Sequence, residues 1–354
     1  MSNPFNLFDD IPDPRAANTS HRLGDLLMVA LAATLCGAVT ASEFALFASE
    51  RWPALHPYVR GRKPPSHDTF SRLFRLIKPE HLATALSRFG EAFAAKLGGG
   101  VVAIDGKALR HACEAGCHAW PPLMVSAFAS SARLCLAALR PRSGAGEVEA
   151  ALDILDMIDI TGKIITADAL HCHHRMAGKI TANGGDYVLG LKKNRPAWMK
   201  AAQAAFAARE CDRAWKVDAS HGRRVRREAS VVVRDAPVCA GHGAFARVVS
   251  QRDGEKEEVR YFLLSRAFKA QEVLSIVRDH WLVENSLHWV LDVHLGEDAG
   301  RARKDHAPEN LALLKRMARN ILQLADKPGV PISHRMHKCA WDKEYLFNAL
   351  RHMR

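Results

Sequence analysis

Two stretches of the sequence decide the fold: VVAIDGK at residues 101–107 and KIITADALH at residues 163–171. Each begins with a short, continuous apolar run, which is typical of a strand buried on both faces of a sheet. The first run ends in Asp105 and the second in Asp168. Side chains at the carboxyl ends of strands in open α/β sheets emerge into a crevice where sites form. We therefore expect the two carboxylates to converge if their strands are neighbours, although a strand-end aspartate can also simply cap a helix.

A third acid comes from HWLVENSLHWVLD, residues 280–292. If this segment is helical, Trp281, Glu284 and His288 lie at i, i+3 and i+7 and share one face. A face that mixes a carboxylate with aromatic rings is unusual for solvent and for a dry core, but Glu284 could also make only surface ion pairs. Three carboxylates suit two Mg²⁺ (or Mn²⁺) ions, and two such ions suit phosphodiester chemistry.

The pattern around these stretches predicts an α/β fold. Apolar runs at 123–129, 134–139 and 186–191 are strand candidates, and 147–158 and 173–183 have helical periodicity. Three strands followed by alternating helices and strands indicate a mixed sheet flanked by helices. β-branched segments then dominate residues 215–265, and helical periodicity returns at 271–291 and 308–324.

The chain divides at composition changes. The first 95 or so residues are mostly helical in pattern, and Gly98–Gly100 marks the best boundary. We predict an N-terminal helical domain, a catalytic core in two pieces, a β-rich insertion before the last catalytic helix, and a basic C-terminal tail. Their residues are, in that order, 1–97, 98–212 with 266–326, 213–265, and 327–354.

Composition excludes several classes of protein. The chain has 354 residues, of which 48% are hydrophobic and 25% charged, the balance of an ordinary globular protein rather than a disordered, fibrous or disulfide-scaffold one. Aromatic residues make up 7%, which disfavours an aromatic platform for single strands. The eight cysteines form no regular framework. The N-terminus lacks an apolar signal core, and the longest apolar run, 26–39, is too short to span a bilayer, so we expect a cytoplasmic protein with no membrane partner.

The formal charge of +12 is concentrated in two blocks. Residues 190–228 hold 11 Lys or Arg against 4 Asp or Glu, and residues 299–354 hold 12 against 5. Clustered cations gain free energy from counterion release along phosphates, so nucleic acid is a candidate partner. A solvated basic surface that serves solubility explains the same composition equally well.

Several motifs together resemble a known family. They are AIDGKALR (103–110), ITADALHCH (165–173), GGDYVLGLKKN (184–194) and the long run from His280 to Leu322. These resemble the H-repeat-associated insertion-sequence transposases of bacteria, in the DDE superfamily. Three N-terminal stretches, IPDPR, ALAATLCGA and PPSHDTFSRLF, are similar to that family's associated domain. The resemblance runs over nearly the whole chain.

The resemblance implies a fold, a reaction and a set of site residues. The fold is an RNase H-like core with a β-strand insertion before the helix of the last acid. The reaction is Mg²⁺-dependent cutting of element ends and transfer of the 3′-OH to target DNA, by a homodimer on double-stranded DNA associated with the nucleoid. Asp105, Asp168 and Glu284 would be the metal-binding triad.

Two departures from the family pattern keep other functions open. Related enzymes often place a Tyr and an Arg upstream of the glutamate and a Lys seven residues after it. Here His280 and Trp281 lie upstream of Glu284, and residue 291 is Leu. The stretch RSGAGEVEA, residues 142–150, keeps Glu147 without the usual polar lead-in. A relic that binds DNA without cutting it, or a metal-dependent nuclease that hydrolyses without strand transfer, remain alternatives.

Basic and polar residues near the predicted acids are candidate DNA contacts. Lys192, Lys193, Asn194 and Arg195 follow a strand at the same sheet edge and would position phosphates. Lys107 and Arg110 follow Asp105 and either contact the scissile phosphate or form a salt bridge that holds the acids apart. On the Glu284 helix, the candidates are Asn285 and His288.

Weaker signals have a competing interpretation in each case. HACEAGCH at 111–118 could be a zinc site, but it lacks a second ligand pair, so a loop is favoured. The histidines of 171–174 could touch phosphate, and a solvated helix start is favoured. The arginines of 223–227 fit a DNA contact or a solvated turn. PPSHDTFSRLF could begin a DNA-reading helix or a packing helix.

Overall fold

The N-terminal part of the chain is helical, as predicted. The computed structural model describes residues 7–16, 19–94, 100–112, 121–142, 144–220, 223–252 and 255–353. Its first helices are α1 (Leu23–Leu35), α2 (Ala41–Glu50), α3 (Trp52–Leu55), α4 (His67–Leu76) and α5 (Pro79–Ala94). Local sequence sets their starts: the Thr40 and Glu43 side chains form a capping box on α2, and Ser66 caps α4 as expected.

The middle of the chain forms one mixed sheet. The strands are β1 (Val101–Ala108), β2 (Leu123–Ala129), β3 (Leu134–Leu139), β4 (Ile164–Ala167), β5 (Asp186–Leu191), β6 (Asp212–Ser220), β7 (Arg223–Val233), β8 (Ala244–Arg252) and β9 (Glu258–Leu264). Their order is β3-β2-β1-β4-β5-β9-β8-β7-β6. β1, β4 and β5 are parallel, whereas β1, β2 and β3 pair antiparallel. The predicted RNase H-like mixed sheet is confirmed.

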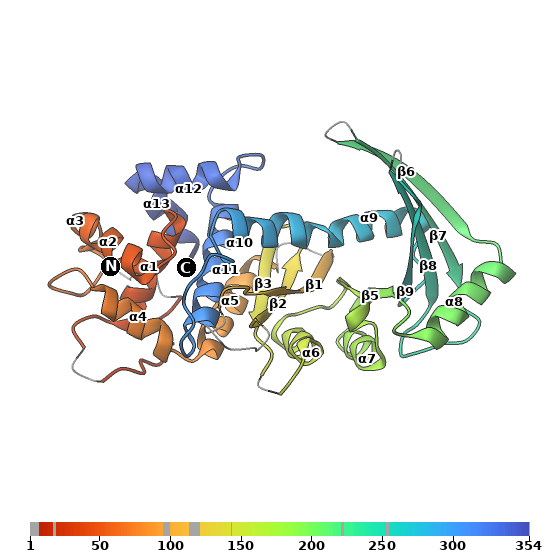
Figure 1. Cartoon of the computed structure of the whole chain (residues 1–354), viewed down its shortest axis with the longest axis horizontal. Coiled ribbons are helices and arrows are strands. Elements are labelled where there is room, and N and C mark those ends of the chain that lie inside the picture. Colours follow the sequence, from red (N-terminus) through yellow and green to blue (C-terminus); the bar gives the residue numbers. More distant parts are fainter. Residues whose placement is uncertain are drawn as a thin grey trace.

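The predicted β insertion extends this sheet. β9 pairs antiparallel with β5, so β6–β9 continue the hydrogen-bonded ladder of the catalytic strands instead of forming a sheet of their own. Figure 1 shows these strands at the end of the molecule farthest from α1. The hydrogen-bonded ladder runs from the catalytic strands into the insertion without a break, so it marks no border between them. The borders of the four predicted domains therefore stay a prediction.

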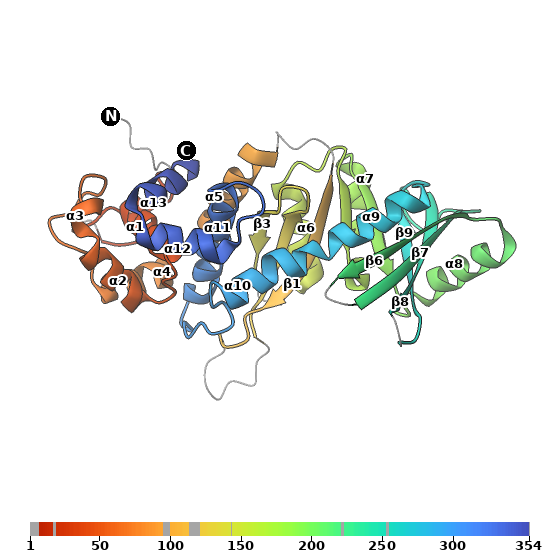
Figure 2. The ribbon, with the colours of Figure 1, turned by 90° about the horizontal axis from the view of Figure 1, so that it is seen from above.

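Helices cover both faces of the sheet. On one face lie α6 (Glu147–Met157), α7 (His174–Ala182) and α8 (Pro196–Ala208), whose apolar side chains share a core with Ile104, Ile165 and Leu189. On the other face lie α9 (Ala270–His280), the π-helical segment η2 (Val283–His288) and α10 (Trp289–Val293). These three run on from one another across the strands (Figures 1 and 2). α11 (Ala307–Leu324) follows them and packs against β3 and α5.

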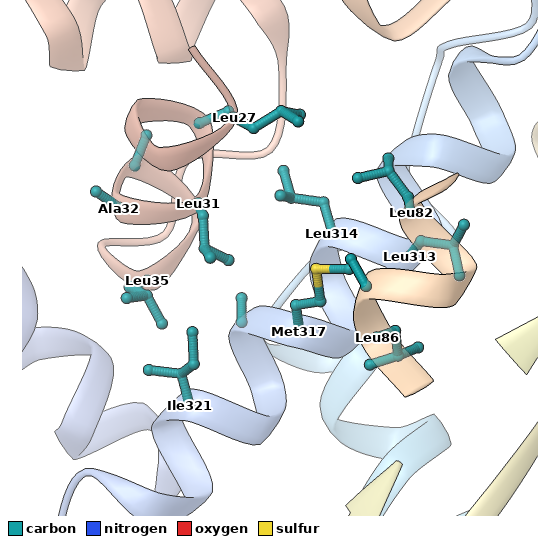
Figure 3. Close-up of a cluster of buried hydrophobic side chains, with 14 of the residues drawn as sticks. Leu27, Leu31, Ala32, Leu35, Leu82, Leu86, Leu313, Leu314, Met317 and Ile321 are labelled. Carbon is teal, nitrogen blue, oxygen red and sulfur yellow. The ribbon is translucent and has the colours of Figure 1, made fainter. Parts of the chain in front are cut away.

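α11 joins the helical region to the sheet. Its residues Leu314, Met317 and Ile321 face Leu27, Leu31 and Leu35 of α1, and Leu82 and Leu86 of α5 lie on its other side (Figure 3). These side chains are almost completely buried. Asn320 of α11 also donates to the Cys135 carbonyl and accepts from the Cys135 N–H, which attaches the helix to β3.

The C-terminal segment differs from the expected basic tail. Residues after 327 form α12 (Ile332–Trp341) and α13 (Lys343–Leu350), and both contact α1. Cys339, Leu346 and Leu350 are buried in the same core as α1. Arg335, counted among the tail charges, is buried and donates to the carbonyls of Leu322 and Lys327. Among the described residues, no helix is long and apolar enough to cross a membrane.

Candidate active site

The three predicted acids line one cleft of about 730 Å³. Asp105 lies on β1, and Asp168 directly follows β4. Ile104 is paired with Ala167 across the two parallel strands, so each aspartate comes next at a matching position. Glu284 reaches the cleft from η2 on the covering helix. Segments far apart in the sequence therefore converge as expected, and we call this space the carboxylate cleft.

The segment that carries Glu284 is wound more widely than an α-helix. Residues 283–288 are π-helical, and such segments are rare and often found at functional sites. Arg319 of α11 is fully buried and donates from Nε (3.1 Å) and Nη2 (2.9 Å) to the carbonyl oxygen of Ser286. The wide turn is thus attached to α11 two residues beyond Glu284.

The cleft disfavours the charged form of Asp105. Burial, with a smaller contribution from the neighbouring Glu284 and Asp168 carboxylates, raises the pKa of Asp105 to about 7. The Gly106 N–H donates to Asp105 Oδ1 at 3.0 Å and opposes that rise. His288 Nδ1 lies 3.7 Å from Asp105 Oδ2. Burial lowers the pKa of His288 to about 3, so the ring is neutral at pH 7 and supplies no compensating charge.

Within the described residues, no Lys or Arg forms an ion pair with Asp105, Asp168 or Glu284. Asp168 also caps the short 3-10 helix η1 (Ala169–His171), because its Oδ1 accepts from the Leu170 N–H at 2.9 Å. In this conformation, no group of three or more His, Cys, Asp or Glu side chains in the described part could hold one metal ion. The donor set is carboxylate oxygen, and Mg²⁺ commonly takes one or two carboxylates and completes its shell with water and substrate phosphate.

Lys192 and Lys193 lie where the sequence predicts. Both line the carboxylate cleft and are exposed at the end of β5. The next two residues have structural contacts instead. Asn194 Nδ2 donates to the Ala169 carbonyl at 2.7 Å, and Arg195 Nε donates to the Cys172 carbonyl at 2.9 Å. They tie the loop after β5 to the loop after β4, so the geometry does not favour them as phosphate ligands.

Lys107 is not available to DNA in this structure. Its side chain is 8% exposed, and its ammonium lies 2.7 Å from Asp292, 2.8 Å from Asp298 and 3.5 Å from Glu297. Glu297 in turn binds the fully buried Arg316 at 2.6 Å. The predicted salt bridge exists, but with these acids rather than with the acids of the cleft. We call Lys107, Asp292, Glu297, Asp298 and Arg316 the buried charge cluster.

The other predicted DNA contacts are scattered. Arg110 is exposed, outside the cleft lining, and 3.5 Å from Asp298. Asn285 is exposed and donates from Nδ2 to the Trp281 carbonyl within its own helix. His288 packs against Asp105 and is mostly buried, so it faces the acids rather than a substrate.

Two of the histidines at 171–174 are buried, contrary to the expected solvated helix start. His171 Nε2 lies 3.2 Å from Glu147 Oε1, and His173 Nδ1 accepts from the Met176 N–H to cap α7. The Glu147 carboxylate packs so close to Gly106 that a Cβ there would lie 2.4 Å from its Oε1. Glu147 also raises the pKa of Asp105, which makes it a fourth acid near the cleft. The sequence signal that could have indicated this role is that the stretch RSGAGEVEA keeps Glu147.

Sequence reasoning missed the wall of the cleft formed by β9. Glu258, Arg260 and Tyr261 line it, and the Arg260 guanidinium lies 4.7 Å from the Trp281 ring centroid. No local pattern could place them, because they reach the cleft only through the pairing of β9 with β5. The possible zinc residues of HACEAGCH from Cys113 onward lie outside the described residues, as do Gly98 and Gly99 of the expected boundary.

Comparison with known proteins identifies the family. A family model described as Transposase DDE domain matches residues 96–321. The chain belongs to this DDE transposase family. The associated model, DDE_Tnp_1-associated, matches residues 5–90, so the two models together confirm the expected family resemblance over residues 5–90 and 96–321.

Individual relatives of this DDE transposase-family chain are bacterial. It is 29% identical over 362 residues to the protein YbfL and 28% identical to "H repeat-associated putative transposase YhhI", both from Escherichia coli (strain K12). Each alignment covers 96% of this chain and 95% of the relative. A protein in the dhlA 3′ region of Xanthobacter autotrophicus is 38% identical over 210 residues, 56% of this chain and 68% of that protein.

A search of solved structures finds the piggyBac transposase synaptic complex with hairpin DNA. The match has a TM-score of 0.46 and 11% sequence identity, and it covers 98% of this chain and 81% of that chain.

Proposed function

We propose that this protein is the DNA transposase of a bacterial insertion sequence, which cuts the ends of its element and joins the 3′-OH to target DNA. The observation that carries the proposal is the carboxylate cleft, where acids from three distant segments meet with no Lys or Arg partner among the described residues. Membership of the DDE transposase family supports the same reaction class.

Asp105, Asp168 and Glu284 would hold two Mg²⁺ or Mn²⁺ ions. Carboxylates that face one another repel unless a cation lies between them, and the Glu284 and Asp168 carboxylates add to the rise that burial causes in the pKa of Asp105. When bound, the ions supply activation of the attacking oxygen and stabilisation of the leaving oxygen. Lys192 and Lys193 at the mouth of the cleft would hold the phosphates on either side of the scissile bond.

The substrate in this proposal is double-stranded DNA, as element ends and as target. Both ends must be handled together, so we propose that a homodimer acts in the DNA complex. The activity places the protein on DNA in the cytoplasm, at the nucleoid.

Cleavage assays test the triad. Purified protein is incubated with Mg²⁺ and a donor DNA that carries the sequences flanking its own gene. Asp105→Asn, Asp168→Asn and Glu284→Gln are each expected to lose cleavage while DNA binding persists. Glu149→Gln is the matched control, because Glu149 is an exposed acid on α6 that pairs with Arg175 at 2.6 Å. Near-normal cleavage by any triad variant would show that the triad is wrongly assigned.

The products separate the proposal from its alternatives. Donor ends joined to target DNA support transposition. Nicks without joining indicate a metal-dependent nuclease. Binding without any cutting indicates a relic that kept only its DNA affinity.

A further inference from the structure

A second groove opens where the N-terminal helices meet the core. It has a volume of about 540 Å³ and lies between α4 on one side and the loop of residues 296–306 with α11 on the other. Its lining includes Ser71, Arg75, Arg301, Arg303, Lys304 and Lys315. We call it the junction groove. Neither the carboxylate cleft nor the proposed reaction uses it.

Positive charge dominates the rim of the junction groove. Arg301, Arg303 and Lys304 are exposed, and none of them forms an ion pair with another described residue. Arg303 Nε donates to the His111 carbonyl at 3.2 Å. Arg75 is paired with Asp305 at 2.6 Å, and among the described residues Asp305 is the one acid paired with a rim cation.

The floor of the junction groove is different in kind. Lys315 is 4% exposed, and its Nζ donates to the Gly296 carbonyl at 3.1 Å. Glu297 lies beside it and is already bound to Arg316 and Lys107. The charged groups of the floor are therefore paired within the protein, whereas the exposed cations of the rim are available to bind an external anion.

α4 forms the opposite wall of the groove, and this position accounts for its amphipathic pattern. Phe70, Leu73 and Phe74 point into the protein core, whereas His67, Ser71 and Arg75 face the groove. The packing interpretation of PPSHDTFSRLF therefore holds for one face of the helix, and the other face is available to a ligand of the groove.

The junction groove and the carboxylate cleft lie on one edge of the sheet. β1 and β5 run in the same direction within the parallel part of the sheet, so their carboxyl ends share that edge. Lys192 and Lys193 follow β5, and Leu109 and Ala112, just after β1, line the groove. The bond from Arg303 to the His111 carbonyl fastens the rim loop to the strand that carries Asp105.

We propose that the junction groove binds the phosphate backbone of the same DNA duplex whose scissile bond enters the carboxylate cleft. The exposed cations suit phosphates, and a duplex offers one every ~1.7 Å along its axis. Contacts of this kind hold the register of the DNA and do not read its sequence. The inference rests on the proposed function, because it takes the cleft to be the point of cutting.

Salt-dependent binding tests the groove. The probe is a 30-base-pair duplex of arbitrary sequence, with affinity measured by fluorescence anisotropy from 50 to 300 mM salt. Each phosphate contact contributes ~0.9 to the slope of log affinity against log salt. The triple variant Arg301→Ala, Arg303→Ala, Lys304→Ala is expected to lower the magnitude of that slope by ~2 to 3 and the affinity at 100 mM salt by at least ~10-fold.

A matched control removes equal charge elsewhere. Arg142→Ala, Arg252→Ala, Lys343→Ala takes three exposed cations from a loop, β8 and α13, none of which lines either cavity. We expect its slope to change by less than ~1. Keeping the charge in the groove with Arg301→Lys and Arg303→Lys should preserve the slope. Circular dichroism confirms that each variant is folded.

Footprinting separates failure of the groove from failure of the function. Hydroxyl radicals should reveal that the groove triple variant loses protection away from the cut site and keeps it at the cut site. If wild-type protein binds and cuts DNA while the triple variant keeps the wild-type slope and footprint, the groove proposal alone is overturned. If wild-type protein neither binds nor cuts DNA, the proposed function fails as well.

Discussion

The acid triad of the carboxylate cleft and the three acids of the buried charge cluster draw on the same strand and the same covering helix. Asp105 and Lys107 lie two residues apart on β1, so their side chains emerge on the same face of the sheet. Glu284 of η2 lines the cleft, and Asp292 of α10 pairs with Lys107 in the cluster. The difference between them is in the cations: Lys107 and Arg316 pair with acids of the cluster, whereas no described Lys or Arg is paired with Asp105, Asp168 or Glu284.

This difference distinguishes charges that stabilise the fold from charges that are kept for function. Paired, hydrogen-bonded charges give the fold its geometry, whereas charges held close together without partners cost stability and are retained for another purpose. Substitution of acids in the two places should therefore have opposite effects, and four experiments test that contrast.

The largest effect is expected in the buried charge cluster. Glu297→Gln removes the partner of Arg316, whose side chain is 0% exposed, and leaves a buried cation without a counter-charge. We expect the free energy of unfolding to fall by ~3 to 5 kcal/mol. Urea denaturation measures it, with Glu149→Gln at an exposed ion pair as a control that should cost less than ~1 kcal/mol. A loss below ~1 kcal/mol at Glu297 would remove the contrast.

The second effect concerns the helix shared by the two regions. Arg319→Met frees the Ser286 carbonyl and lets η2 shift, which displaces Glu284. We expect cleavage to slow ~10- to 100-fold, which is ~1.4 to 2.8 kcal/mol in the barrier, at unchanged DNA affinity. The Mg²⁺ concentration for half-maximal cleavage should rise, an effect that general destabilisation does not produce.

Arg335→Met is the matched control for Arg319. Arg335 is also buried and also donates to backbone carbonyls, but it lies on α12, away from the cleft. It should lower the melting temperature without changing the Mg²⁺ dependence. Equal behaviour of the two arginine variants would show that Arg319 has no special relation to Glu284.

The third effect has the opposite sign to the first. Asp105→Asn removes a buried carboxylate that faces Glu284 and Asp168. In metal-free buffer at pH 8 we expect it to raise the free energy of unfolding by ~1 kcal/mol, because the charge is buried without a cation. Asp168→Asn should gain less, since the Asp168 carboxylate also caps η1. A clear loss of stability in Asp105→Asn would mean that the acids of the cleft are compensated after all.

The smallest effect comes from a paired acid near the surface. Asp326 accepts from Lys338 at 2.6 Å, and this bond lowers the pKa of Asp326 to about 2, below its ordinary value of 3.8. The pair therefore contributes stability above pH ~3.8, and that contribution is lost as the pH falls through ~2. We expect Asp326→Asn to cost ~0.5 kcal/mol at pH 7, with solvent screening limiting it, and almost nothing at pH 2. Thermal melts of both proteins at each pH test this; an equal difference at the two pH values would contradict it.

Much of the fold could be predicted because local signals agree with it. Strands β2, β3 and β5 begin and end at the predicted residues, since turn residues bound each apolar run. α4 starts directly after Ser66, the residue predicted to cap it. The convergence of Asp105 and Asp168 followed from the rule for parallel strands, and the arrangement of β1 and β4 satisfies that rule.

Tertiary contacts decided what the sequence could not. The C-terminal helices were mistaken for a tail because Arg335 and Lys338 are basic in composition, although Arg335 satisfies buried carbonyls. The sequence leaves Lys107 open between a phosphate contact and a salt bridge, because its acidic partners Asp292 and Asp298 lie more than 180 residues later. The π-helical turn at Glu284 is hydrogen-bonded to Arg319, more than 30 residues later, and no periodicity in residues 283–288 reveals it.

The attachment of α11 to β3 has a consequence for synthesis of the protein. Asn320 is hydrogen-bonded to Cys135 of β3, and Arg319 is hydrogen-bonded to the turn beside Glu284. These contacts of the sheet edge and of the last acid form only after residues near 320 have been synthesised. At ~5 to 20 residues per second, a ribosome needs ~10 seconds or more to pass from β3 to that point, and the chain that has emerged meanwhile lacks a closed core. A gene copy truncated before α11 would therefore yield a product without an assembled cleft, so frameshifts late in the reading frame should silence the protein as completely as early ones.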